Sequence, residues 1–383
     1  MRELEAIIST YEGSPDRDFV LATVVHVEGS SYRKAGARML VDEEGRMTGA
    51  ISGGCLEGDA LRKALHALHQ GRNKLITYDT SDESDAVIGA QLGCNGVIRV
   101  LFEPVSARDA HNPVELLKSV AASERPMVII TLFNLDHSQA QGGTVMVFDE
   151  SMRANGKVSS PALAEQLHAD AERAFVAGHK HFATYKKGGE EQGHAFIELY
   201  SPPPRLVLVG AGNDAQQLAS LAAILGWRIT VTDGRPTHAR EDRFTSSCQV
   251  VVSHPEEVLT HIRVDERTVF VLISHNYGYD LAVLKLLLDR REVPYIGILG
   301  SRGKFDRILQ DLEAEGLAPD DEQMKRIFAP VGLSIGGESP SEIGLSIIAE
   351  IQMVLTGSSG GSLRDQTGPI HTKQYNDFKV TPL

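Results

Sequence analysis

The stretch that decides the fold is Leu206-Val207-Leu208-Val209-Gly210-Ala211-Gly212-Asn213-Asp214-Ala215. Its apolar start predicts a buried strand, and the G-x-G-x-x-A pattern that follows begins a predicted helix. Val231-Thr232-Asp233 ends the next predicted strand and places an acidic residue 23 positions after Gly210. Glycines between strand and helix, with an acid about 20 residues later, are typical of a Rossmann turn that binds dinucleotides.

Each residue of this turn has a predicted physical role. Gly210 allows the tight turn, Gly212 lets a pyrophosphate approach the backbone, and Ala215 permits close packing of helix on strand. The free N–H groups of the helix N-terminus attract an anion. Asp233 is placed to accept a hydrogen bond from a ribose hydroxyl, while Arg235 could accommodate a 2′-phosphate instead.

The residues leave open whether this turn binds a nucleotide or NAD(P), or is a Rossmann turn that has lost its ligand. Asp214 lies in the first helical turn, where its negative charge opposes an anion bound close by. This charge lowers the expectation of tight dinucleotide binding.

Working outward, apolar strands and amphipathic helices alternate for about 150 residues. Strands are predicted at 206–209, 228–232, 249–253, 268–273, 295–299 and 327–330, with helices near 214–225, 255–261, 279–290, 303–315 and 340–356. Unalternating apolar strands separated by helices predict a doubly wound parallel sheet. Ligands of such sheets bind at the carboxyl ends of the strands, where His275, Gly300, Ser301 and Gly336 are further candidates.

A short polyproline spacer, Ser201-Pro202-Pro203-Pro204, predicts a domain boundary, because it cannot continue a helix or a central strand. The predicted domains are 1–200, a mixed α/β domain with two sublobes at 1–105 and 106–200, and 201–357, the Rossmann-like domain. Residues 358–383 are predicted to be a poorly ordered tail, with docking on a neighbour as the alternative.

Composition excludes several classes of protein. The chain has 383 residues and a net charge of −13, which argues against binding nucleic acid through phosphate contacts. It has no apolar run long enough to span a membrane, and its N-terminus lacks the apolar region of a signal peptide. Three cysteines are too few for a disulfide framework, so a reducing cytoplasm is expected.

Two further loops in the first half contain residues suited to binding a ligand. The first is Gly29-Ser30-Ser31-Tyr32-Arg33-Lys34-Ala35-Gly36-Ala37-Arg38, with three cations in an acidic protein. The second is Gly49-Ala50-Ile51-Ser52-Gly53-Gly54-Cys55-Leu56-Glu57-Gly58. It ends at a predicted helix N-terminus, which favours the thiolate of Cys55. Two tight turns around a buried cysteine are the alternative, and Cys94 lies in a third glycine-rich turn.

Taken together, these residues resemble the XdhC/CoxI family of accessory factors for molybdenum hydroxylases. The similarity rests on the two loops above, on Gly210-Ala211-Gly212 with Asp233-Gly234-Arg235-Pro236, on Ile296-Gly297-Ile298-Leu299-Gly300-Ser301, and on Pro340-Ser341-Glu342-Ile343 with Ser346 to Ile351. Asp233-Gly234 stands where the family often has Asp-Pro, and Gly303-Lys304 where a second arginine is common.

The resemblance implies a protein that binds molybdenum cofactor and holds it while a cysteine desulfurase exchanges an oxo ligand for sulfur. It then hands the cofactor to a xanthine dehydrogenase-type hydroxylase, and a homodimer is expected. Such a carrier needs no catalytic residue of its own. The expected cofactor-binding residues are Ser30, Ser31, Arg33, Arg38, Gly53, Gly54, Cys55, Glu57, Cys94, Gly210, Gly212, Asp233, His275, Gly300, Ser301 and Gly336, with Cys55 as the candidate contact to molybdenum or sulfur.

The main alternative is an NAD(P)-dependent oxidoreductase with a separate substrate domain. It explains the Rossmann turn, but it leaves the glycine–cysteine loops unexplained and lacks a clear proton donor. A ligand-sensing regulator is a third alternative, because sensing and carrying use the same kind of binding surface.

Overall fold

The computed structural model describes residues 2–29, 31–79, 96–158, 160–187, 190–367 and 378–382. The chain folds into two compact units. Unit 1 comprises residues 1–202 and 367–383, and unit 2 comprises residues 203–366. The division falls within the polyproline stretch Ser201–Pro204. Each unit is described by itself below.

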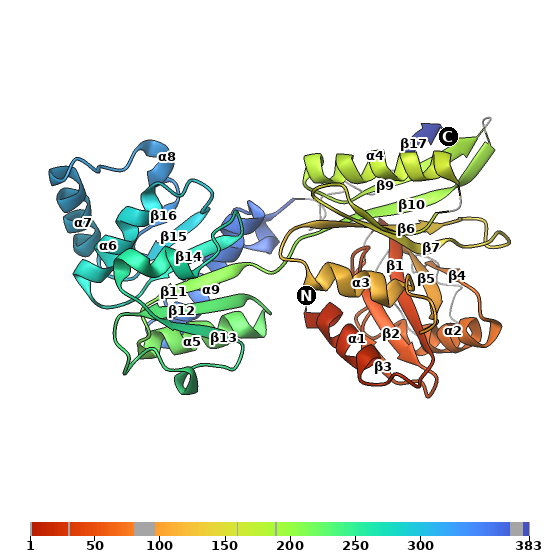
Figure 1. Ribbon diagram of the computed structural model, residues 1–383, viewed down its shortest axis with the longest axis horizontal. Coiled ribbons are helices and arrows are strands. Elements are labelled where there is room, and N and C mark those ends of the chain that lie inside the picture. Colours follow the sequence, from red (N-terminus) through yellow and green to blue (C-terminus); the bar gives the residue numbers. More distant parts are fainter. Residues whose placement is uncertain are drawn as a thin grey trace. The chain divides into compact units, whose positions relative to one another are not determined.

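Unit 1 contains two sheets (Figure 1). The first is antiparallel, in the order β3-β2-β1-β5-β4, with strands β1 (Phe19–Gly29), β2 (Arg38–Asp42), β3 (Met47–Gly49), β4 (Lys74–Asp79) and β5 (Gly96–Val105). The second has the order β17-β9-β10-β6-β7-β8, with strands β6 (Met127–Phe133), β7 (Gly143–Asp149), β8 (Ala154–Gly156), β9 (His181–Lys187), β10 (Glu190–Tyr200) and β17 (Phe378–Pro382). Strand β17, from the predicted tail, runs parallel to β9.

The two sheets of unit 1 pack face to face, and a helix covers each outer face. Leu101 of β5 lies in one apolar cluster with Phe182 of β9 and Phe196 of β10. The alanines of α2 (Glu57–Gln70) pack on the first sheet, and α4 (Pro161–Ala177) packs on the second. Helices α1 (Arg2–Glu12) and α3 (Pro113–Ala122) join a further cluster formed by both sheets. Unit 1 therefore has four layers, helix–sheet–sheet–helix.

Unit 2 is a parallel six-stranded sheet in the order β13-β12-β11-β14-β15-β16, which confirms the predicted doubly wound fold. Its strands are β11 (Arg205–Val209), β12 (Arg228–Asp233), β13 (Cys248–Val252), β14 (Thr268–Leu272), β15 (Tyr295–Ile298) and β16 (Ile327–Phe328). Helices α5 (Asn213–Ile224) and α9 (Pro340–Thr356) cover one face. The other face is covered by η3 (Pro255–His261), α6 (Tyr277–Leu288) and α7 (Arg302–Ala314), and the short α8 (Asp321–Met324) follows α7.

Local signals account for most helix ends in unit 2. Ser339 and Glu342 form a reciprocal capping box at the start of α9, with Pro340 at its first position, and Gly357 ends the helix at φ 65°. The helix predicted at 255–261 is instead the 3-10 helix η3, which begins at Pro255.

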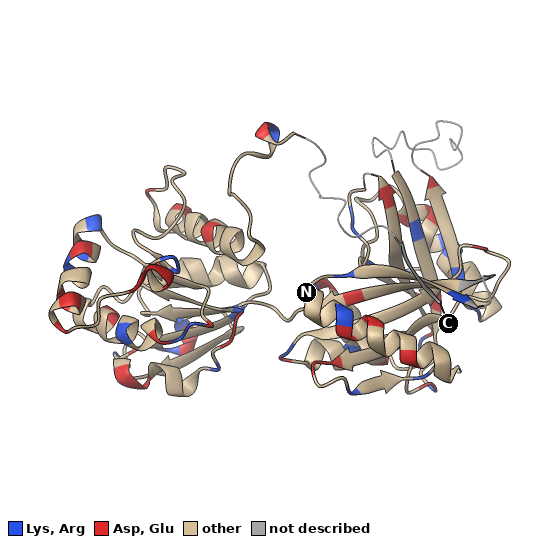
Figure 2. Cartoon of the chain, turned by 90° about the horizontal axis from the view of Figure 1, so that it is seen from above, with Lys and Arg blue, Asp and Glu red and all other residues tan. Residues whose placement is uncertain are grey.

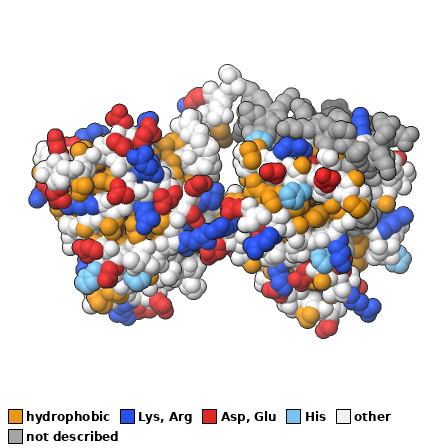
Figure 3. All heavy atoms as spheres, turned by 45° about the horizontal axis from the view of Figure 1, so that its top comes forward, with side chains coloured by type: hydrophobic (Ala, Val, Ile, Leu, Met, Phe, Trp, Pro, Cys, Tyr) orange, Lys and Arg blue, Asp and Glu red, His pale blue; other side chains and the backbone are white. Residues whose placement is uncertain are grey.

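Charged residues of both signs are scattered along the elements of both units (Figure 2), and their side chains are spread over the face seen in Figure 3. Among the described residues, no helix combines the length and apolar character needed to cross a membrane.

Candidate functional site

The loop between β3 and α2 is organised by one hydroxyl. Ser52 Oγ accepts hydrogen bonds from the backbone N–H of Gly54 (3.2 Å) and Leu56 (3.1 Å), and it donates to the carboxylate of Glu57. The Cys55 thiol lies 3.5 Å from the same oxygen. Glu57 Oε1 in turn accepts from Ser52 N at 2.8 Å. Several N–H groups of this loop are therefore already hydrogen-bonded within the loop itself.

Glu57 also gives the start of α2 a negative charge of its own. Burial raises the pKa of Glu57, but the hydrogen bonds from Ser52 outweigh it and hold the pKa below its usual value. An ionised carboxylate at a helix N-terminus stabilises the helix and disfavours a second anion there. The group that this loop presents to solvent is the thiol of Cys55, which is exposed and free.

The structure brings the two loops predicted in the first half side by side. Arg33 forms an ion pair with Glu3 and donates to the Ala50 carbonyl at 3.1 Å. The Tyr32 ring lies against Gly53, because a Cβ added to that glycine would lie 3.3 Å from ring carbons of Tyr32. The ring is itself 71% exposed. An exposed aromatic face thus lies beside the loop that carries Cys55.

Arg38 links the first loop to the second sheet of unit 1. It is buried, and its Nη2 forms an ion pair with Glu198 Oε2 at 2.6 Å. Lys180 donates to the Ala35 carbonyl at 2.8 Å, and Gly36 (φ +99°) leaves room for Glu198, which a Cβ there would approach to 2.5 Å. The guanidinium expected to contact the cofactor therefore has a structural partner in the second sheet. Lys34 beside it is exposed, with no ion pair to any described residue.

A buried polar layer continues between the sheets beyond Arg38. Glu103 accepts from Thr144 N at 2.5 Å and from its hydroxyl at 3.1 Å, and Thr144 Oγ1 lies 3.2 Å from Thr131 Oγ1. Burial raises the pKa of Glu103 to about 7, against the opposing effect of the Thr144 hydrogen bonds and the charge of Arg38.

Two of the expected site residues, Ser30 and Cys94, lie outside the described residues. Ser31 holds its own loop by donating to the Arg33 carbonyl at 2.9 Å. Among the described residues, no group of His, Cys, Asp and Glu side chains has the arrangement of a metal site.

In unit 2, the two glycines of the Rossmann turn have different surroundings. Gly210 has φ +127°, and a Cβ there would lie 2.5 Å from the carbonyl of Ile273, so the close approach of β11 and β14 requires a glycine. Gly212 precedes α5, and a Cβ there would meet only His275 Cδ2, at 3.8 Å. Gly210 is therefore needed for packing, whereas the backbone at Gly212 remains open to the approach of a ligand.

Asp233 is already saturated. Its Oδ2 accepts from Ala211 N (2.8 Å) and Arg235 Nη2 (2.7 Å), and its Oδ1 accepts from Arg235 Nε and N, both at 2.9 Å. Burial raises the pKa of Asp233, but the Arg235 hydrogen bonds prevail and keep the pKa below its usual value. A ribose hydroxyl would have to compete with Arg235 for this carboxylate.

His275 pairs with Asp214 at the start of α5. Its Nε2 lies 3.1 Å from Asp214 Oδ2, and its backbone has φ 57°, which is uncommon for a residue other than glycine. The imidazole and the carboxylate thus lie next to the turn where a phosphate would meet the helix.

The remaining candidates of unit 2 lie at the same carboxyl edge. Ser301 caps α7 by accepting from Lys304 N at 3.3 Å, and Gly300 has φ +147° beside the Lys304 side chain. Gly336 (φ +76°) has open space around it. Lys304 also forms an ion pair with the buried Asp280 at 2.7 Å, and Ser274 donates to Asp280 at 2.6 Å.

Sequence reasoning assigned no role to Lys180, Glu198 or Asp280, and it noted Lys304 only as a departure from the family pattern. Glu198 and Lys180 lie in the region to which no motif assigned a role, and no local pattern links them to Arg38 or Ala35. Lys304 follows Gly300-Ser301 closely, so the sequence alone indicated that it lies at the carboxyl end of a strand.

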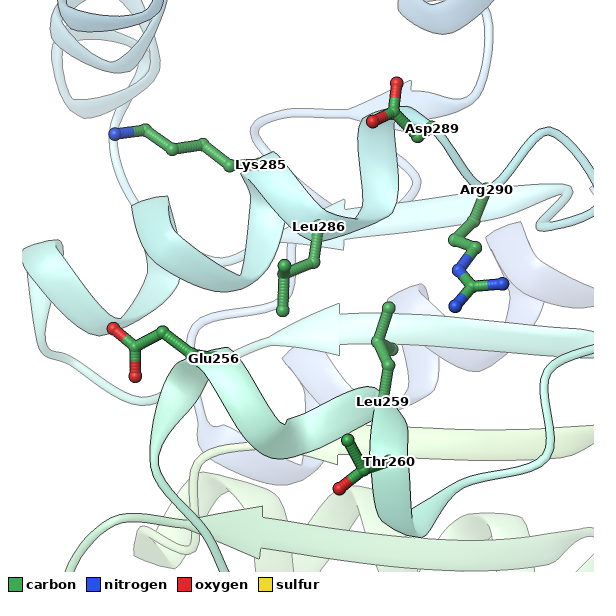
Figure 4. A pocket seen from close by; sticks show the side chains of 7 residues that line it. All are labelled: Glu256, Leu259, Thr260, Lys285, Leu286, Asp289 and Arg290. Carbon is green, nitrogen blue, oxygen red and sulfur yellow. The ribbon is translucent and has the colours of Figure 1, made fainter.

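A groove of about 580 Å³ lies between η3 and α6, away from all of these residues (Figure 4). Leu259 and Leu286 point into it from the two helices, and charged side chains surround them. None of the expected site residues lines it.

Comparison with known proteins gives a consistent result across the chain. Residues 206–351 match the XdhC Rossmann domain, and residues 14–79 match the XdhC and CoxI family. A probable xanthine dehydrogenase subunit of Bacillus subtilis is 32% identical over 349 residues, or 91% of this chain and 95% of that protein. The molybdenum cofactor insertion chaperone PaoD of Escherichia coli is 25% identical over 335 residues, or 88% of this chain and 83% of that protein.

A solved structure agrees with these sequence matches. The crystal structure of a xanthine dehydrogenase from Bacillus halodurans superposes with a TM-score of 0.74 at 29% identity, covering 95% of this chain and 98% of that one. The similarity therefore extends over both units. This chain belongs to the XdhC and CoxI family.

Proposed function

We propose that this chain is an accessory factor that binds molybdenum cofactor, protects it during sulfuration by a cysteine desulfurase, and delivers it to a xanthine dehydrogenase-type hydroxylase. The proposal includes a cytoplasmic location and a homodimer. It is supported by the relatedness to a molybdenum cofactor insertion chaperone and to a xanthine dehydrogenase subunit. The structural observation that carries it is the exposed Tyr32 ring lying against the loop of the free Cys55 thiol.

The residues around this loop fit the cofactor, which is a pterin bearing a phosphate and a dithiolene-held metal. Tyr32 offers an exposed aromatic face for the planar ring, and Cys55 is a soft ligand of the type that suits a thiophilic metal. Lys34 offers an exposed ammonium for the phosphate. A Cβ added to Gly54 would meet no atom within 4 Å, so the backbone there is open to a ligand.

This chain's own part is to bind, orient and release. When bound, the cofactor supplies the metal centre that is sulfurated. Glu3, Glu198 and Lys180 fix the two loops through Arg33, Arg38 and the Ala35 carbonyl. Since Glu57 occupies the α2 N-terminus, we propose that the phosphate meets Lys34 instead of that helix.

The test is co-expression with the cofactor pathway, followed by oxidation and fluorescence measurement of the pterin that co-purifies. We expect bound pterin in the parent protein and less in Tyr32→Ala and Lys34→Ala. Lys157→Ala, which removes an exposed lysine elsewhere in unit 1, is the matched control. Parent protein without pterin would refute the carrier, and equal retention in all variants would refute this placement.

A second proposal concerns the Rossmann turn, where the sheet order and the open approach to Gly212 support a nucleotide or NAD(P) as ligand. Because Arg235 donates to both oxygens of Asp233, binding would require Arg235 to move, which favours ligands with a 2′-phosphate whose oxygens can accept hydrogen bonds from this guanidinium. Calorimetry with NAD, NADP and nucleotides tests this, with Gly212→Val as the variant that blocks the turn. Tight binding with substrate-dependent reduction of NAD would support the oxidoreductase instead.

A further inference from the structure

Arg243 lies beside the Rossmann turn, although the glycine motif of the sequence does not include it. It is the last residue of the short 3-10 helix η2 (Glu241–Arg243), which lies between β12 and β13. Its Nη1 donates to the Ala211 carbonyl at 2.8 Å, and its Nη2 donates to Asn213 Oδ1 at 3.1 Å. Ala211 and Asn213 flank Gly212 in the sequence, so the guanidinium is fixed next to the open backbone of the turn.

The charge of Arg243 is not neutralised by any carboxylate among the described residues. Its third hydrogen bond goes to the His238 carbonyl at 2.9 Å, so all of its acceptors are backbone carbonyls or an amide oxygen. Two other arginines of the same connection, Arg235 and Arg240, each form an ion pair with an aspartate, at 2.7 and 2.5 Å. A guanidinium stays protonated in proteins. Arg243 therefore adds a permanent positive charge to the turn.

The hydrogen bonds of Arg243 leave one edge of its guanidinium free. Nη1 has an acceptor for each of its two hydrogens, and Nη2 has one for one of its two. The Nε hydrogen and the other Nη2 hydrogen have no acceptor in the described part of the chain, and Nε is not buried. Neighbouring Nε–H and Nη2–H groups form the fork that binds two oxygens of one phosphate.

Arg243 also orients the side chain of Asn213, the first residue of α5. Because Oδ1 accepts from Arg243, the remaining polar atom of the amide is Nδ2, which is a donor. Asn213 is exposed, and no described residue accepts a hydrogen bond from its Nδ2. The first N–H groups of α5 have no side-chain cap either. The polar groups offered around Gly212 are therefore hydrogen-bond donors from a guanidinium, an amide and the backbone.

The charge of Asp214 at this turn is offset by Arg243. Asp214 is the acid in the first turn of α5, where a negative charge opposes a bound anion. Its carboxylate lies 3.1 Å from His275 Nε2. The guanidinium of Arg243 is hydrogen-bonded to Asn213, the residue directly before Asp214. The acid alone therefore does not set the sign of the charge that a ligand meets.

We propose that Arg243 is a phosphate-binding residue of the Rossmann turn. Its Nε–Nη2 edge, together with Asn213 Nδ2, binds one phosphate group of a nucleotide. The inference rests on the nucleotide site proposed for this turn, and it names a residue outside the glycine motif that gives the site its preference for phosphorylated ligands. A carboxylate has two oxygens and is used up by the guanidinium edge. A phosphate has further oxygens for the amide and for the N–H groups of α5.

The test is isothermal titration calorimetry of the full chain with ADP and with inorganic pyrophosphate, at several salt concentrations. Arg243→Gln should weaken the binding of both by about ten- to hundredfold, the usual effect of losing a charged hydrogen bond. Its affinity should also fall less steeply with salt, because one cation is missing. Arg243→Lys keeps the charge without the fork, so we expect an intermediate affinity with the salt dependence of the parent. Arg240→Gln is the matched control, since Arg240 is already paired with Asp242.

Each other outcome overturns a different part of the inference. A parent protein that binds neither ADP nor pyrophosphate refutes the nucleotide site, and this inference with it. Equal affinity of the parent and Arg243→Gln refutes the role of Arg243 alone. Weaker binding with the salt dependence of the parent means that Arg243 only holds the carbonyls of the turn in place. If the fluorescence of Trp227 shows that Arg243→Gln does not fold, Arg243→Lys and Asn213→Ala replace it, and unchanged affinity in either one contradicts the inference.

Discussion

The thiol of Cys55 is the residue whose role is most open to a direct test. Replacing it by serine exchanges an exposed thiol, which we propose as a soft ligand, for a hydroxyl of similar size, so the fold should change little. We expect Cys55→Ser to retain pterin but to lose the sulfurated form at least roughly tenfold faster. Removing even a residue that contacts a metal ligand indirectly typically lowers metal affinity or activity by about tenfold or more. The measurement is activation of a hydroxylase by the loaded protein over time, with Cys248→Ser as control. Equal activation by all three proteins would leave Cys55 without a role in delivery.

Glu103 should make the stability of unit 1 depend on pH. Its pKa is about 7 in the folded chain, above the ordinary value of 4.5, so the folded state binds more protons between these limits. Stability should therefore fall as pH rises from 4.5 to 7 and stay low above that, with a total loss of about 3 kcal/mol. Urea unfolding of Glu103→Gln should show no such fall. The exposed Glu165→Gln should behave as the parent does, and a parent protein without the fall would contradict the burial argument.

Residue types were predictable at both sites, but their partners were not. The sequence places Arg33 and Arg38 in a cationic loop, whereas the structure pairs them with Glu3 and Glu198. Arg38 and Glu198 are 160 positions apart, so no spacing rule connects them. Their ion pair depends on how two sheets stack, which is a property of the whole unit. The Asp233–Arg235 pair is local, and its two members were both singled out in the sequence, although as ligand contacts.

At the scale of elements, the Rossmann half could be predicted well because its signals are local. Buried parallel strands are continuous apolar runs, and caps such as Ser339-Pro340 mark where helices begin. In the second sheet of unit 1 the strands themselves, such as β6, were predictable from their apolar residues, whereas the order β17-β9-β10-β6-β7-β8 follows from no local pattern. Strand β17 was not predicted from a local pattern, because what defines it is its pairing with β9, which lies much earlier in the sequence.

The packing role of Gly210, in the turn between β11 and α5, can be tested by comparison with a glycine that has open space around it. Gly210→Ala forces a Cβ to within 2.5 Å of the Ile273 backbone at a φ of +127°, so we expect a loss of about 3 kcal/mol or more. A Cβ at Gly278, in α6, would meet only Asn276 Oδ1 at 3.7 Å, so Gly278→Ala should be neutral or stabilising by up to about 1 kcal/mol. Fluorescence of the buried Trp227 reports on unfolding of unit 2. Equal stability of the two variants would show that β11 and β14 can separate at little cost.

At the scale of the whole molecule, the chain leaves unit 1 after β10, builds unit 2, and returns to unit 1 as β17. Unit 2 is therefore continuous in sequence, whereas unit 1 is completed by the last residues of the chain. A truncation at the C-terminus therefore removes part of unit 1, although the residues just before it in the sequence belong to unit 2.

A chain that ends at Gln366 should show this directly. It lacks β17, which pairs with β9 from Phe378–Phe182 to Pro382–Lys186, while residues 203–366 of unit 2 remain complete. Losing an edge strand removes several backbone hydrogen bonds, each worth about 1 kcal/mol, so unit 1 should unfold at lower urea concentration. The transition seen by Trp227 fluorescence should not move, because that residue lies in unit 2. The uncovered edge of β9 is also a template for pairing with other chains, so aggregation at high concentration is expected. A shift of the Trp227 transition instead would mean that β17 supports unit 2, and that the two units are not independent in stability.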